Sequence, residues 1–173
     1  MKVFSTIFLL LFLFSCNPQK RIAESKFYEE NKNVNLYAFI GEKISVESFD
    51  PNKNNKKKIK DPSSRDSIIV TEYVMDNAFN CKYKILQNVF NTIENDTINF
   101  KAYDHYGNPG FEEYKYVLLY ISKSQTEGYV HMKYQFDPIK KTKNEFMGLN
   151  GKSIEKLFNI KKNTVLKERK LFE

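Results

Sequence analysis

The sequence is poor in several residue types, and each shortage excludes a class of protein. It has no tryptophan, two cysteines and two histidines among 173 residues. Two cysteines cannot build the disulfide framework of a small secreted domain. Stability must therefore come from packing, for which 41% hydrophobic residues are enough. This length suits one domain.

Arginine is scarce as well, although the chain is basic. The 28 basic and 21 acidic residues give a net charge of +7, but the only arginines are Arg21, Arg65 and Arg169. Proteins that read nucleic acids normally use the paired donors of arginine. We therefore expect no nucleic-acid partner.

The first residues predict export. After Lys2, an apolar run from Val3 to Phe14 is interrupted only by Ser5 and Thr6. This run is too short to cross a hydrocarbon core of ~30 Å at ~1.5 Å per residue. It is typical of the hydrophobic part of a secretory signal peptide.

The run ends in Leu13-Phe14-Ser15-Cys16, which resembles the lipobox of bacterial lipoproteins. The resemblance implies cleavage before Cys16 and acylation of that residue, so that the lipid bilayer is a partner; several acyl chains anchor a protein stably. The alternative is an uncleaved signal with an incidental cysteine. We expect residues 1–15 to be the signal peptide, 16–33 the lipidated cysteine and a tether, and 34–173 a single domain. Some Gram-negative lipoproteins that are exported to the cell surface have an acidic cluster after this cysteine, so by the same resemblance its absence here implies a protein that faces the periplasm. We expect it in the outer membrane of a Gram-negative bacterium.

The domain itself alternates between apolar and polar residues. Even-numbered apolar residues from Val34 to Val46, including Ile44, predict a long half-buried strand with a bend at Gly41. The lysine-rich segment 49–67 is predicted to be a solvated hairpin tip, with a patch that binds anions or lipid headgroups as the alternative. Further strands are expected at 68–76, 79–90, 97–104, 114–122 and 129–137. In the last of these, Val130, Met132, Tyr134 and Phe136 should face the core, with His131, Lys133 and Gln135 outward and Pro138 ending the strand.

These patterns predict a mainly β fold, a small antiparallel OB-like barrel of five or six strands with one or two short helices. One helix should begin after Ser153. The order of "FIG" (39–41), "KYKILQNVF" (82–90), "DTINF" (96–100) and "YKYVLLYIS" (114–122) resembles netrin-like OB domains, the class that contains tissue inhibitors of metalloproteinases. The resemblance implies the fold and not the inhibition, because the family's disulfide cysteines are absent and Cys16 would be acylated.

No sequence motif for catalysis is present. There is no HExxH, CxxC, GxSxG or phosphate-binding glycine loop. Asp104, His105 and His131 are the candidates for a metal-dependent or acid/base hydrolase, if their strand ends meet. Cys81 lies on an apolar face and should be buried and inert. We therefore assign no catalytic residue and expect no metal or cofactor.

The connection "YDHYGNPGFEEY" (103–114) is the main candidate binding surface. Its glycines, asparagine and proline favour turns, and exposed aromatic residues on a rigid loop often bind partners. The candidate residues are Tyr103, Asp104, His105, Tyr106, Phe111 and His131. We expect a membrane-anchored envelope lipoprotein that binds an envelope protein without catalysis; the alternatives are the hydrolase and an immunity or inhibitor-type lipoprotein.

Overall fold

The structure is a computed structural model that describes residues 26–53, 55–64, 66–71, 73–143 and 145–173. The predicted signal peptide, residues 1–15, and Cys16 lie outside the described residues. Within those ranges, no helix is long and apolar enough to cross a membrane.

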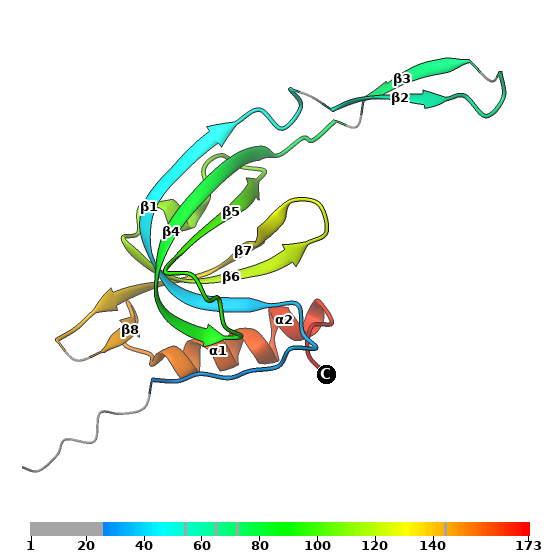
Figure 1. Ribbon diagram of the computed structural model, residues 1–173. Coiled ribbons are helices and arrows are strands. Elements are labelled where there is room, and N and C mark those ends of the chain that lie inside the picture. Colours follow the sequence, from blue (N-terminus) through cyan, green and yellow to red (C-terminus); the bar gives the residue numbers. More distant parts are fainter. Residues whose placement is uncertain (1–25, 54, 65, 72, 144) are drawn as a thin grey trace, which may run out of the picture.

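Five strands form a closed ring (Figure 1). They are β1 (Tyr37–Phe49), β4 (Asn77–Phe90), β5 (Thr97–Asp104), β6 (Tyr116–Ser124) and β7 (Gly128–Lys141). The order is β5-β4-β1-β6-β7, with antiparallel neighbours, and a parallel pairing of β5 with β7 at Lys101 and Val130 closes the ring. This pairing is that of an OB-like barrel, so the predicted fold class is confirmed.

The remaining elements lie outside the ring of five strands. The 3-10 helix η1 (Gly110–Glu113) joins β5 to β6, and the short strand β8 (Phe146–Gly148) pairs with the end of β7. Helix α1 (Ile154–Asn163) begins at Ser153, as predicted, because the Ser153 side chain accepts a hydrogen bond from Lys156 N. Helix α2 (Val165–Glu168) follows directly. Strands β2 (Lys56–Lys60) and β3 (Ser67–Thr71) form a separate hairpin that projects from the barrel end remote from α1.

Alternation along the strands builds two cores. Strand β6 supplies both, since Val117, Leu119 and Ile121 belong to one cluster and Leu118 and Tyr120 to the other. The inner core fills the barrel with Phe39, Phe79, Cys81, Tyr83, Ile93, Ile98, Phe100, Ala102 and Phe111. The outer core lies between the sheet and the helices and includes Leu36, Ala38, Ile40, Val89, Phe90, Ile139, Ile154, Leu157, Phe158 and Leu166. Strand β6 is therefore buried on both faces, as its continuous apolar run predicted.

Strand β1 bends where the sequence placed a glycine. The register with β4 shifts between Ile40 and Gly41 and again between Lys43 and Ser45. A Cβ at Gly41 would lie 3.0 Å from side-chain atoms of Phe39 and Tyr83, so glycine allows this close approach. The second shift leaves Ile44 exposed, and its predicted inward position was wrong for that reason.

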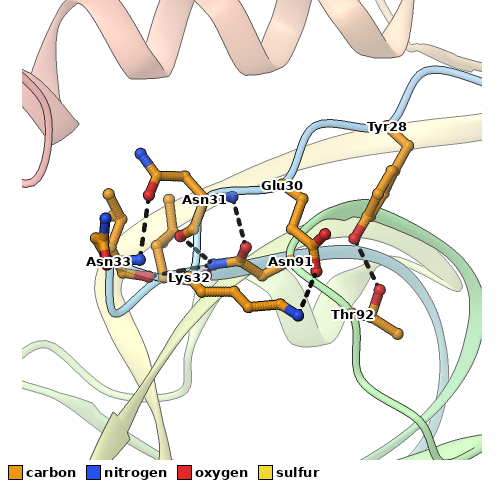
Figure 2. Close-up of polar contacts among 9 residues, drawn as sticks. Tyr28, Glu30, Asn31, Lys32, Asn33, Asn91 and Thr92 are labelled. Carbon is orange, nitrogen blue, oxygen red and sulfur yellow. Dashed lines mark hydrogen bonds and ion pairs between the residues drawn. The ribbon is translucent and has the colours of Figure 1, made fainter.

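The segment before β1 lies on the domain as a strap, residues 27–36. Glu29 bridges to Phe90, the Phe27 ring lies 5.8 Å from that of Phe158, and Tyr28 bonds to Thr92 through its hydroxyl. The buried Asn91 fixes the strap, because its Nδ2 lies 2.9–3.1 Å from three strap carbonyl oxygens and its Oδ1 accepts from Asn31 N (Figure 2). The packed domain therefore begins before residue 34.

Candidate functional site

The structure divides the six candidate binding residues between the core and the surface. Phe111, on η1, is fully buried in the inner core, where its ring lies 4.7 Å from that of His131. Asp104 is buried at the end of β5, and its Oδ1 accepts a hydrogen bond from Tyr106 N. The Tyr103 hydroxyl donates to Glu127, on the turn between β6 and β7. Only His105 and Tyr106 of the six are largely exposed.

The residues of the hydrolase hypothesis have separate partners. His131 is buried inside the barrel, and its Nε2 lies 2.9 Å from the Gln135 carbonyl oxygen. His105 is exposed and lies 3.2 Å from Asp76. Among the residues that the structure describes, no three histidine, cysteine or acidic side chains are grouped so as to hold a metal ion. Burial holds the pKa of His131 down at about 4, so this imidazole is neutral near pH 7.

His131 faces inward because β7 contains a wide irregularity. Leu119 pairs with Phe136, whereas Ile121 pairs with His131, so extra residues of β7 bulge between these pairs. Tyr134 lies in the bulge with φ at 66°, a left-handed conformation that is uncommon for such a residue. The bulge changes the phase of the strand. The predicted outward positions of His131 and Gln135 and the inward position of Tyr134 were therefore wrong. Pro138 does not end the strand, which continues to Lys141.

The bulge carries Lys133 and Tyr134 to the loop after β5. There they join Asp76, His105 and Tyr106 in a surface cluster that we call the aromatic rim. Lys133 Nζ lies 2.7 Å from Asp76 Oδ2, and the rings of Tyr106 and Tyr134 stack at 6.4 Å between centroids. The His105 ring meets the edge of Tyr106 at 5.1 Å, and Lys133 lies over Tyr134 at 5.3 Å. Three separate segments of the chain thus hold one another in place.

Asp76 is the carboxylate at the centre of the rim, where it contacts both Lys133 and His105. The hydrogen bond from Lys133 lowers the pKa of Asp76, and the contact with His105 lowers it further. The same Asp76 raises the pKa of Lys133. Asp76 therefore stays ionised and holds both Lys133 and His105, while Tyr106 remains 87% exposed.

A surface hollow of about 460 Å³ adjoins the rim at the base of the hairpin. It shares Asp76 with the rim and is lined by residues 48–52, 73–79, Gly107 and Asn108. Asn52 joins the two chain segments of this lining, since it exchanges hydrogen bonds of 2.9 and 2.8 Å with Val74. Tyr73 and Met75 are exposed on its border. The hollow and the rim form a mixed polar and aromatic surface at one end of the barrel.

Sequence reasoning missed two residues of the rim. Asp76 looked like the end of a strand, and Tyr134 was expected in the core. The one usable signal was the position of Asp76 directly before a strong strand pattern, at the same barrel end as the loop after β5. The side chain of Cys81 is buried, as predicted, and burial raises its pKa to about 12, so its thiol stays protonated.

The fold and site define a class: an OB-like barrel with a C-terminal helical layer and an aromatic rim beside an inserted hairpin. Searches against known protein families, curated proteins and solved structures found no significant match.

Proposed function

We propose that the protein is a lipid-anchored lipoprotein of the bacterial envelope whose barrel binds a partner protein through the aromatic rim. The observation that carries the binding proposal is that the Tyr106 ring is exposed to solvent and yet held in place by neighbouring side chains. This ring stacks on Tyr134, which lies in the bulge of β7. The residues next to the two rings, His105 and Lys133, both contact Asp76. A rigid exposed tyrosine loses little conformational freedom on binding, which is why tyrosine is common at the centres of interfaces.

The anchor half of the proposal comes from Leu13-Phe14-Ser15-Cys16. The strap is compatible with it, because the chain leaves the domain beside α1, whereas the hairpin and the hollow at its base lie at the remote end of the barrel (Figure 1). Anchored in this way, the protein would present the rim end away from its own bilayer. The location in the outer membrane, facing the periplasm, is part of the same proposal.

The hydrolase alternative has less support. His131 is enclosed by Phe100 and Phe111, and its Nε2 is already bonded to a backbone carbonyl. The immunity or inhibitor alternative differs from the proposal only in the identity of the partner, so the experiment that identifies a partner also decides this question.

Site-specific photo-crosslinking tests the binding surface in the full-length protein in cells. A photoreactive phenylalanine analogue at Tyr106 should give a discrete crosslinked product. The matched control is the same analogue at Ile160, which is exposed on α1. Equal products from both positions, or none from Tyr106, would contradict the proposed surface.

Lipid labelling tests the anchor separately. Cys16→Ser should abolish incorporation of labelled fatty acid, whereas Cys81→Ser should leave it intact. Label that persists in the Cys16→Ser protein would overturn the lipoprotein proposal, whereas the proposed binding surface at the aromatic rim would be unaffected.

A further inference from the structure

The β2–β3 hairpin exposes apolar side chains that its own fold does not cover. Within the described part of the chain, β2 and β3 pair only with each other, and none of their residues is buried. Ile69 is 70% exposed, and Ile59 and Ile68 are 43% and 40% exposed. A two-stranded hairpin is marginally stable by itself, and further strands stabilise it.

The two outer edges of the hairpin differ in charge. Strand β2 reads KKKIK, with lysine at every position except Ile59. Lysine on an edge strand discourages the addition of another strand. Strand β3 reads SIIVT and carries no charge, so β3 is the edge that accepts a partner.

The sequence of β3 indicates which partner fits. SIIVT has nearly the same chemistry in both directions around Ile69: hydroxyl, β-branched, β-branched, β-branched, hydroxyl. We infer that β3 pairs antiparallel with β3 of a second copy of this chain. Ile69 then faces its own symmetry mate, Ile68 faces Val70, and Ser67 faces Thr71.

Each of these pairs is favourable. β-Branched side chains opposite each other and hydroxyl pairs stabilise antiparallel strands, and a two-fold interface uses the same patch on both copies. The product is a four-stranded sheet of order β2-β3-β3-β2, in which the lysine strands lie outside. No two lysines oppose each other across the new pairing.

The position of the hairpin leaves room for this contact. It extends beyond the barrel, and the barrel wall does not run alongside it (Figure 1). A lipid surface or an extended segment of another protein are the competing occupants of the β3 edge, and neither gives contacts that are symmetric about Ile69. The inference needs neither the rim nor the anchor.

Cysteine crosslinking in cells that express the full chain tests the pairing. Ile69→Cys should give a disulfide-linked dimer under mild oxidation, because directly opposed residues of antiparallel strands lie at about the Cα separation that disulfides require. The matched control is Ile44→Cys, which places a cysteine on the exposed side of β1. Cys16 and Cys81 are present in every sample and serve as the common background.

The register gives a sharper test. Ser67→Cys copies should link poorly to themselves but readily to co-expressed Thr71→Cys copies. Ile69→Lys in both should reduce this mixed product by about tenfold, because two lysines then oppose each other on the axis, whereas Lys56→Ala should not. Equal linkage of Ile44→Cys and Ile69→Cys, or of Ser67→Cys with itself and with Thr71→Cys, would overturn the inference. Unchanged circular dichroism of the variants would show that the barrel remains folded.

Discussion

His131 places an ionisable ring in an apolar barrel, surrounded by Phe100 and Phe111. The charges of Lys161 and Arg169 add to the effect of burial and oppose protonation. The hydrogen bond to the Gln135 carbonyl oxygen partly offsets it. The pKa of His131 in the folded protein is therefore about 4, whereas that of a free imidazole is 6.5.

This difference predicts a loss of stability in mild acid. Between pH 6.5 and about 4 the unfolded chain binds a proton at His131 that the folded chain does not, so the free energy of unfolding falls as the pH falls through this window. The loss due to His131 should reach roughly 3 kcal/mol. His131→Phe should remove it. Urea unfolding of both proteins from pH 7 to 4 measures the difference, and parallel curves would contradict the prediction.

Asn91 acts through its side chain and its backbone together. Its φ of 51° is left-handed, and its amide holds the strap by four hydrogen bonds. Asn91→Gly keeps the backbone conformation and should lose about 2–3 kcal/mol from the hydrogen bonds. Asn91→Ala should lose about 1 kcal/mol more because alanine resists a positive φ. Chemical unfolding compares the two, and a glycine variant as stable as the wild type would refute the role of the side chain.

At the scale of the elements, alternation in the sequence predicted most of the barrel. Strands β5 and β6, and β4 as far as Ile85, have the inward residues that a period of two assigns. Beyond Ile85 the register of β4 with β1 shifts twice, so Val89 lies in the outer core although it is odd-numbered like the inward Phe79 and Tyr83. The exceptions share one cause, a change of register. The shift beside Ile44 and the bulge at Tyr134 contain no glycine or proline, so the sequence has no local signal for either irregularity. The aromatic rim depends on that bulge, so the sequence located half of the site and misplaced the rest.

Helix α1 offers a simple test of a local signal that was predicted correctly. Ser153→Ala removes the hydrogen bond to Lys156 N and should cost about 1 kcal/mol. Ser153→Asp keeps an acceptor at the positive end of the helix and should retain the stability. Thermal unfolding measures both; an alanine variant that melts at the wild-type temperature would show that the cap contributes nothing.

The molecule as a whole divides into a packed barrel with its helical layer and an appended hairpin. None of the described residues of the hairpin belongs to either core, and Asn52 already joins its two ends through Val74. Replacing residues 54–72 by two glycines should therefore leave the free energy of unfolding within about 0.5 kcal/mol of the wild type. Urea unfolding of the monomer at high dilution checks this, and a large loss would mean that the hairpin supports the barrel.

The strap has a mechanical consequence. In a protein anchored through Cys16 as proposed, tension would enter the described domain at residue 26. The load meets the Glu29–Phe90 bridge, the Phe27–Phe158 contact and the Asn91 amide before it reaches β1. If the protein is anchored through Cys16 as proposed, a pull from the membrane is therefore borne first where the strap contacts α1 and the end of β4, before it acts on β1.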